Sequence, residues 1–139
     1  EELLLEKKLN LTEVITFKKF IKEINVSKKK LVQFLKRMQK FGKKIHCYGA
    51  STKGNVLLQY YGIDNKLIQY AAERNKFKYN LFTPGSKIKI ISEKNSRMLK
   101  PDFYLVLPWH FKKEILLREK KIRKRGVKFI FPLPKLSII

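Results

Sequence analysis

Residues 48–55 read YGASTKGN and join a short apolar run, residues 44–50, to a helix-like stretch, residues 54–62. Five of these eight residues are Gly, Ala, Ser or Thr, whose small side chains let a ligand approach the backbone. A buried strand, a glycine turn and a helix in this order form the geometry in which backbone N–H groups hold a phosphate. The segment therefore predicts either an anion site at a helix start or an ordinary strand-to-helix turn with a capping hydroxyl.

Two sharper phosphate-binding motifs do not fit this turn. The P-loop pattern GxxxxGK[ST] needs a lysine after its second glycine, whereas Lys53 precedes Gly54 and Asn55 follows it. The dinucleotide fingerprint GxGxxG needs a glycine in the middle, and the chain has Ser51 there. The hydroxyls of Ser51 and Thr52 and the ammonium of Lys53 remain as general donors to an anion.

Strand-like and helix-like segments alternate beyond this turn. The expected strands are residues 44–50, 66–73, 87–92, 102–109 and 127–134, with expected helices at 54–62 and 110–126. Glu114–Arg118 and Glu119–Arg123 are i,i+4 pairs that favour the second helix. Few of the strands are joined by hairpin turns, so we expect right-handed crossovers and a mostly parallel sheet. The predicted fold class is α/β, a three-layer Rossmann-like domain preceded by an N-terminal helical segment.

The N-terminal part is predicted to be helical. Asn10 with Glu13 has the spacing of a capping box, Ser27 offers a second N-cap, and Gly42 is a stop signal. The apolar spacing fits two helices or one long interrupted helix. We therefore expect a helical segment, residues 1–41, that packs on a Rossmann-like domain, residues 42–139.

In an open parallel sheet, ligands bind beyond the carboxyl ends of the strands. The stretches that follow the expected strands are GASTKGN, ERNKFKYN, SEKNS and PWHF, and with the TPGS turn they are the polar, Gly- or Pro-marked parts of the chain. Topology alone therefore predicts a site made from these loops.

The size and composition fit one folded domain. The chain has 139 residues, of which 44% are hydrophobic and 12% aromatic. No apolar run reaches the roughly 18–20 residues of a membrane span, and residues 1–10 do not read as a signal peptide. We expect no membrane partner, and the absence of an initial Met is compatible with a domain of a longer chain.

The positive charge has two explanations. The formal net charge is +22 and the pI is near 10.2, a field that attracts polyanions such as nucleic acid. However, 27 of the 33 basic residues are Lys and 6 are Arg, and the lysines are spread along the chain. Because base and bidentate phosphate recognition favour Arg, a lysine-rich solvated surface is the preferred explanation and nucleic acid is not the expected partner.

The single cysteine and the two histidines give little sign of chemistry. Cys47 has no partner for an internal disulfide, and with His46 and His110 it makes no zinc pattern. We expect Cys47 and His46 to be packed in a strand, His110 to lie at a helix start, and the chain to work in the reducing cytoplasm.

Four stretches occur in one order: YGASTKGNVLLQYYGI, ERNKFKYNLFTPGSKIKI, KPDFYLVLPWHFKKEI and GVKFIFPLP. Together they resemble the C-terminal domain of the sugar C-methyltransferase family, over residues 30–139. These enzymes use S-adenosylmethionine to methylate a carbon of a nucleotide-linked deoxysugar. The resemblance implies a longer enzyme with a zinc module and a central methyl-donor domain upstream. It implies that this segment holds no cofactor of its own, has no catalytic residues and does not transfer methyl groups alone.

The resemblance also implies a substrate site for the nucleotide diphosphate of the sugar. Carried over position by position, its residues are Gly49, Ala50, Ser51, Thr52, Lys53, Gly54, Asn55, Glu73, Arg74, Asn75, Lys78, Pro84, Gly85, Pro108, Trp109 and His110. Glu73 stands where Rossmann-like sheets place a partner for ribose hydroxyls. Lys76, Asn80 and Lys89 depart from the family's usual Pro, Gly and Pro, which changes the surface loops.

The leading hypothesis is therefore a nucleotide-sugar-binding domain whose partners are the sugar nucleotide and an upstream S-adenosylmethionine-binding domain. The alternative is a basic nucleotide- or nucleic-acid-binding module without methyltransferase activity. A third hypothesis is a related enzyme that uses another cofactor. The missing GxGxxG motif argues against NAD as that cofactor.

Overall fold

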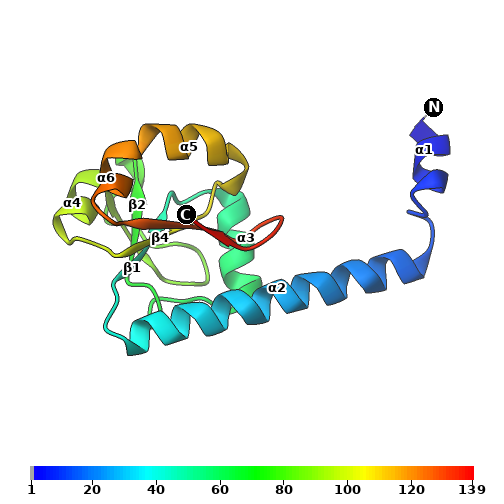
Figure 1. The fold of residues 1–139 in the computed structure, drawn as a ribbon, viewed down its shortest axis with the longest axis horizontal. Helices are drawn as coiled ribbons and strands as arrows, with labels where there is room; N and C mark the ends of the chain where they lie inside the picture. The colour runs from blue at the N-terminus through cyan, green and yellow to red at the C-terminus, as the bar shows by residue number, and fades with distance from the viewer. Residues whose placement is uncertain (1) are drawn as a thin grey trace.

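The computed structural model describes residues 2–139 and contains six strands and six α-helices (Figure 1). The strands are β1 (Ile45–Tyr48), β2 (Tyr70–Glu73), β3 (Lys89–Ser92), β4 (Phe103–Val106), β5 (Lys128–Phe131) and β6 (Ser137–Ile138). The α-helices are α1 (Glu2–Lys8), α2 (Val14–Lys40), α3 (Thr52–Tyr61), α4 (Glu93–Met98), α5 (Lys112–Arg118) and α6 (Lys120–Lys124), with 3₁₀ turns η1 (Lys76–Lys78) and η2 (Trp109–Phe111).

All strands belong to one sheet with the order β3-β2-β1-β4-β5-β6. The five longer strands are parallel, and β6 alone is antiparallel, paired with β5. The chain runs outward from β1 to β3 and then returns to place β4 on the other side of β1. The connections after β1 and β4 therefore lead to helices on opposite faces of the sheet, and open α/β sheets bind ligands at this point. The predicted mostly parallel Rossmann-like sheet is confirmed.

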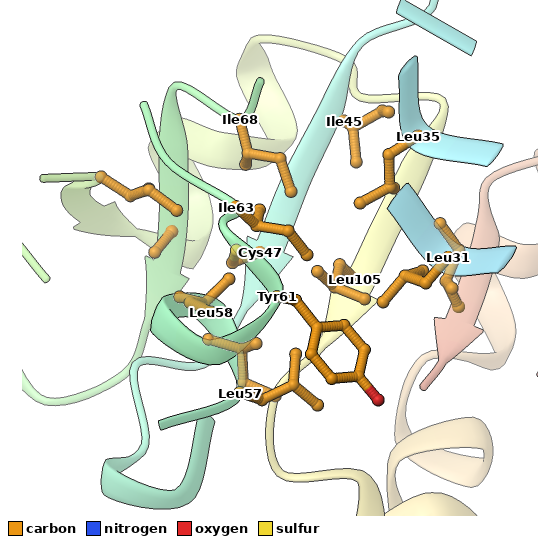
Figure 2. Packing of buried hydrophobic residues seen from close by; sticks show 14 of the residues in the cluster. Leu31, Leu35, Ile45, Cys47, Leu57, Leu58, Tyr61, Ile63, Ile68 and Leu105 are labelled. Carbon is orange, nitrogen blue, oxygen red and sulfur yellow. The ribbon is translucent and has the colours of Figure 1, made fainter. Parts of the chain in front are cut away.

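Side chains alternate across the sheet and fill a core on each face. Cys47 of β1 packs on one face with Leu105 of β4 and with α2 and α3, whereas the neighbouring Tyr48 packs on the other face with Phe129. Figure 2 shows Leu31 and Leu35 of α2 pointing into the first core toward Leu105 and Ile45. The helices α4, α5 and α6 lie over the second face, so the domain has three layers (Figure 1).

Helix α2 is a single helix of 27 residues, which settles the question of one helix or two. It begins after Glu13, without a side-chain cap, and Ser27 lies in its middle. The expected Asn10 cap is wrong, because Asn10 lies in a turn with a left-handed φ of 52°. The helix ends as predicted beside Gly42, whose φ is 70°.

Three further elements differ from the sequence-based expectation. Residues 93–98, expected as a loop, form the short helix α4, which Ser92 caps through a bond from the N–H of Asn95. The strand expected from residue 66 starts only at Tyr70, because a turn at Asp64 accepts the N–H of Ile68. The expected helix 110–126 is divided into η2, α5 and α6. Separately, no helix among residues 2–139 is long and apolar enough to span a membrane.

The division of that helix has a tertiary cause at Glu119. Glu119 is only 2% exposed, and its carboxylate accepts bonds from Arg97 and Arg118 and from the hydroxyl of Tyr48. The backbone at Glu119 leaves the helical region, with φ −94° and ψ 17°, as this side chain turns inward. Among residues 2–139, neither expected i,i+4 pair forms; Arg118 instead pairs with Glu93 and Glu119.

Two alanine variants of α2 test whether its second half, but not its first half, packs in the core. Leu35 is fully buried, and Leu35→Ala should lower the free energy of unfolding by about 2–5 kcal/mol. Ile15 is 70% exposed in the same helix, and Ile15→Ala should change it by less than about 0.5 kcal/mol. Denaturant unfolding of both variants measures the difference, and equal losses would contradict the packing described.

Candidate functional site

A hollow of about 420 Å³ lies beyond the carboxyl ends of β1, β2 and β4, on the side of α5. We call it the switch-point hollow. It is lined by Tyr48, Gly49, Ala50, Ser51, Ala72, Glu73, Arg74, Lys78, Glu93, Pro108, Phe111, Glu114, Ile115 and Arg118. Apolar surface from the strands and α5 therefore meets side chains of both charges in one place.

The glycine turn after β1 is fixed by its neighbours. Gly49 has a φ of 79°, a left-handed conformation that side chains disfavour, and its N–H donates to the carbonyl of Ala72 at 2.7 Å. A Cβ on Gly49 would lie 3.1 Å from Cδ of Pro108. Gly49 thus lets the loops after β1 and β4 approach each other at the rim of the hollow.

The start of α3 is capped from within the turn. Ser51 Oγ accepts the N–H of Gly54 at 3.1 Å, and the carbonyl of Ser51 accepts the N–H of Asn55. Within residues 2–139, the N–H groups of Thr52 and Lys53 have no acceptor. They lie at the positive end of the helix dipole, which favours an anion there.

Gly54 has the packing role of the last glycine in the dinucleotide fingerprint. A Cβ at this position would lie 2.4 Å from Cβ of Leu107 in the segment after β4. The close approach sets α3 directly against the sheet, which keeps the helix start next to the turn. Ser51 stands where the fingerprint has its middle glycine, which lets a ligand approach the backbone. Here the Ser51 side chain caps α3 instead.

Glu73 binds the turn rather than facing the hollow as a free carboxylate. Its Oε2 accepts the N–H of Ala50 at 2.9 Å, and its Oε1 accepts those of Arg74 at 2.7 Å and Asn75 at 3.1 Å. Lys78 Nζ lies 3.6 Å from Oε2 and donates to the carbonyl of Ala50 at 3.0 Å. This arrangement ties the end of β2 to the turn after β1.

These contacts decide the charge state of Glu73. Burial by itself would raise the pKa of the carboxyl, but the three backbone N–H groups and the Lys78 ammonium outweigh it and hold the pKa below its ordinary value. Glu73 is therefore ionised throughout the neutral range and keeps its hold on the turn.

A charged network closes the other wall of the hollow. Arg118 pairs with Glu93 and with Glu119, and it also contacts the hydroxyl of Tyr48. Arg97 Nη2 lies 3.0 Å and 3.2 Å from the two carboxylate oxygens of Glu119. Burial and the bond to Glu119 raise the pKa of Tyr48, so its hydroxyl stays protonated and donates.

His46 and Cys47 are packed inside β1. The Nδ1 atom of His46 lies 2.8 Å from Oγ of Ser96, and burial together with the charge of Lys44 lowers the pKa of His46 to about 4. Burial raises the pKa of the Cys47 thiol, which is not a nucleophile at neutral pH. Both match the packed strand residues expected from the sequence.

The structure brings only part of the expected site residues to the switch-point hollow. The residues that line it are Gly49, Ala50, Ser51, Glu73, Arg74, Lys78 and Pro108. Thr52, Gly54 and Asn55 follow in the first turn of α3, and Asn75 caps η1 through a bond from the N–H of Phe77. His110 is exposed beside the ring of Phe111.

Four other expected residues lie elsewhere. Lys53 and Trp109 line a separate apolar hollow of about 230 Å³ with residues of α2 and α3. Pro84 and Gly85 pack against the side chain of Gln59 at the opposite half of α3 from the glycine turn. A diphosphate in the switch-point hollow would therefore be out of contact with the Pro84–Gly85 turn.

Sequence reasoning missed several residues that line the hollow. Glu93 and Phe111 lie in the stretches SEKNS and PWHF that topology predicts at the site, although neither was named as a site residue. Tyr48 of β1 and Glu114 and Arg118 of α5 were not expected there at all. Arg118 was assigned to a surface pair within its own helix. Its actual partners lie on other elements, so nothing in the local spacing identifies them. Within residues 2–139, no group of three His, Cys, Asp or Glu side chains is arranged to hold a metal ion.

Two comparisons relate the chain to known proteins. A family model described as "C-methyltransferase C-terminal domain" matches residues 2–134. The C-methyltransferase NovU of Streptomyces niveus is 36% identical over 98 residues, which is 70% of this chain and 23% of that protein. The chain therefore matches less than a quarter of the length of this curated relative.

Gly54→Ala tests the contact between α3 and the segment after β4. Helix propensity alone predicts a gain of about 1 kcal/mol from this change. The clash with Leu107 predicts a net loss of about 1–3 kcal/mol in the free energy of unfolding instead. The sign of the change, measured by denaturant unfolding, decides between them.

Glu73→Gln tests the hold on the turn. At pH 7 it should lower the free energy of unfolding by about 1–3 kcal/mol, because three backbone N–H groups, of which that of Ala50 is part-buried, lose a charged acceptor. The folded pKa of Glu73 is depressed, so this contribution is complete above the ordinary carboxyl pKa of about 4.3 and is lost as the pH falls toward the lower folded value.

The difference between wild type and Glu73→Gln should therefore narrow as the pH is lowered below about 4.3. Glu114→Gln is the matched control, because Glu114 is exposed on α5 and loses the same charge. Its effect should be within about 0.5 kcal/mol at each pH. A gap for Glu73→Gln that does not change with pH would show that its charge has no part in holding the turn.

Proposed function

This chain belongs to the C-methyltransferase C-terminal domain family, and on that premise we propose that it binds the nucleotide diphosphate of a nucleotide-linked deoxysugar. A neighbouring domain of the same polypeptide then transfers the methyl group to a carbon of the sugar. The chain is in this proposal the substrate-recognition part of a transferase in deoxysugar biosynthesis, and it has no methyltransferase activity alone.

The observation that carries the proposal is the glycine turn at the switch point. The N–H groups of Thr52 and Lys53 have no acceptor within residues 2–139, and they lie at the positive end of α3 beside the hollow. A diphosphate offers several oxygens to such donors. The guanidinium of Arg74 lines the same hollow and forms no ion pair among the described residues, so it is free to contact a second phosphate.

The rest of the hollow suits a sugar nucleotide in shape and chemistry. Tyr48, Phe111 and Ile115 give it an apolar wall against which a ring can pack. Glu114 and Glu93 supply acceptors for hydroxyl groups, and Pro108 closes the rim. A hollow that offers both donors and acceptors suits a ligand that carries both phosphates and hydroxyls.

The methyl donor fits this hollow poorly. S-adenosylmethionine would need an acidic side chain at the end of the second strand to accept its ribose hydroxyls. Glu73 stands there, but its oxygens already accept three N–H groups and face Lys78. We therefore propose that S-adenosylmethionine, and any zinc, bind in other domains of the polypeptide. The buried thiol of Cys47 fits a reducing, cytoplasmic setting.

A basic nucleic-acid-binding module is the alternative from a different class, and one observation favours it. Lys18, Lys22, Lys29, Lys36 and Lys40 recur along one face of α2, and all of them are exposed. Such a row attracts a phosphate backbone. Its affinity for an oligonucleotide would fall steeply with added salt, which separates it from a diphosphate site.

Calorimetric titration tests the proposal directly. The ligands are thymidine diphosphate, uridine diphosphate and a short single-stranded oligonucleotide, each at low and at physiological salt. We expect binding of at least one nucleoside diphosphate that survives added salt. Oligonucleotide binding alone, lost with salt, would reject the sugar-nucleotide proposal in favour of the basic module.

Variants of the turn locate the bound phosphates. Arg74→Gln should weaken nucleoside diphosphate binding about tenfold, because a charge-assisted bond contributes roughly 1.5 kcal/mol or more. Lys53→Ala keeps the backbone N–H and removes a side chain that lines the separate hollow, so it should change the affinity little, and a large loss would assign the Lys53 ammonium to the phosphates. Lys124→Gln is the control, since Lys124 is exposed on α6 and lies outside the lining of the hollow.

A further inference from the structure

The first half of α2 has an apolar stripe that is largely uncovered among the described residues, with only its last residue, Ile24, packed partly against the core. Phe17, Phe20, Ile21 and Ile24 recur at spacings of three and four residues, so they share one side of the helix. We call these four residues the α2 stripe. Phe17, Phe20 and Ile21 are 51%, 58% and 50% exposed. Figure 1 shows this half of α2 projecting away from the α/β body together with α1.

The α2 stripe continues an interface that the structure already contains. About two and three turns beyond Ile24, on the same side of the helix, are Leu31 and Leu35, both fully buried against the sheet. Ile24 is the transition, because it packs partly against that core. The same side of one helix thus packs on the α/β body at one end and is bare at the other.

The bare surface is concentrated at this end of the molecule. Among residues 2–139, eleven of the 23 exposed large hydrophobic side chains fall within residues 3–26. Monomeric domains rarely leave a contiguous apolar patch of this kind uncovered. A helix half without tertiary contacts is also only marginally stable in water. Both facts indicate that another surface covers the α2 stripe.

A groove on the α/β body adjoins the stripe. Phe20, Ile24 and Ser27 of α2 line a hollow of about 400 Å³ with Trp109 and Leu133. A second hollow of about 230 Å³, with almost entirely apolar walls, shares Ile24, Trp109 and Leu133 with it. We call the two together the Trp109 groove. It widens the apolar surface from a single helix side to a shallow depression between α2, α3 and the segment after β4.

We propose that the α2 stripe and the Trp109 groove bind the domain that precedes this one in the same polypeptide. The family is that of a C-terminal domain, and the curated relative is more than four times as long as the stretch it shares with this chain. The stripe lies on the first helices of the domain, where a preceding domain is joined. This inference rests on family membership and does not depend on nucleotide binding.

Charge on α2 supports this occupant over a nucleic acid. Lys18, Lys22 and Lys29 lie on the side away from Phe20 and Ile24, whereas Lys28 lies on the side of Ile24 and Leu31 and donates to the carbonyl of Tyr60. A polyanion attracted to Lys18, Lys22 and Lys29 would leave the stripe bare. An apolar protein surface that packs on the stripe would instead leave these lysines in water, so that their charges are not desolvated.

The position of the groove gives this interface a role in substrate placement. Trp109 borders the groove and follows Pro108, which lines the switch-point hollow. A domain seated in the Trp109 groove would therefore stand next to the mouth of the hollow. The docking surface and the proposed sugar site would be joined through two consecutive residues of one loop.

Hydrogen exchange measures whether the stripe is covered. Amides of residues 14–26 are compared in the 139-residue chain and in the polypeptide that includes the preceding domain. We expect exchange at these amides to be roughly tenfold slower in the longer polypeptide, because local opening then breaks an interface. Equal exchange in the two would overturn the proposal.

Paired variants of the longer polypeptide assign the protection to the stripe. Phe17→Gln with Ile21→Gln should restore the fast exchange of the 139-residue chain. Lys18→Gln with Lys22→Gln alters the same turns on the opposite side and should leave the protection intact. All four side chains are exposed, so the variants should unfold at the temperature of the wild-type 139-residue chain.

Two further outcomes would replace the proposed occupant. Sedimentation that shows dimers of the 139-residue chain, abolished by the stripe variant, would assign the surface to a second copy. Binding of that chain to vesicles of anionic lipid, abolished by the same variant, would assign it to a membrane. The affinity of the 139-residue chain for a nucleoside diphosphate should be the same in all these variants. Failure of the docking proposal can therefore be distinguished from failure of the nucleotide-binding proposal.

Discussion

The carboxylate of Glu73 holds together the two loops on which the candidate site depends. By accepting N–H groups from Ala50, Arg74 and Asn75, it fixes the end of β2 to the turn after β1. That turn in turn sets the first residues of α3 beside the sheet, where Gly54 allows contact with Leu107. The acidic residue that Rossmann-like folds offer to a ribose is used here for architecture, which leaves the backbone N–H groups at the start of α3 and Arg74 as the donors in the proposed site.

The fold could be predicted from the sequence wherever a local pattern carried it. The apolar runs located the five parallel strands, and Gly42 and Gly62 ended their helices as expected, both with left-handed backbone. The misses have tertiary causes. Helix 110–126 was read as continuous because its spacing is helical, yet burial of Glu119 interrupts it. The two residues of β6 carry no pattern of their own and become a strand only by pairing with β5.

The candidate site was predictable in its glycine turn and much less so in its walls. Sequence order places Gly49 to Ser51 and Glu73 after neighbouring strands, which is enough to bring them together in a parallel sheet. Arg118 contacts Tyr48 across 70 positions of sequence, and spacing says nothing about such a contact. Pro84 and Gly85 were expected near the glycine turn but pack on Gln59. Gln59 is in the C-terminal part of α3, whereas the glycine turn precedes the N-terminus of that helix.

Helix α2 is one uninterrupted element with its last turns in the core and its first turns outside. At 1.5 Å per residue its 27 residues make a rod about 40 Å long. Because one end of this helix is packed in the core, its other end has a fixed position relative to the sheet. Whatever is attached along its free half is held at a set distance and angle from the sheet, and a one-residue insertion near Ser27 would turn that attachment by about 100° around the axis. The proposed interface therefore depends on the length and phase of this helix as well as on the side chains of the α2 stripe.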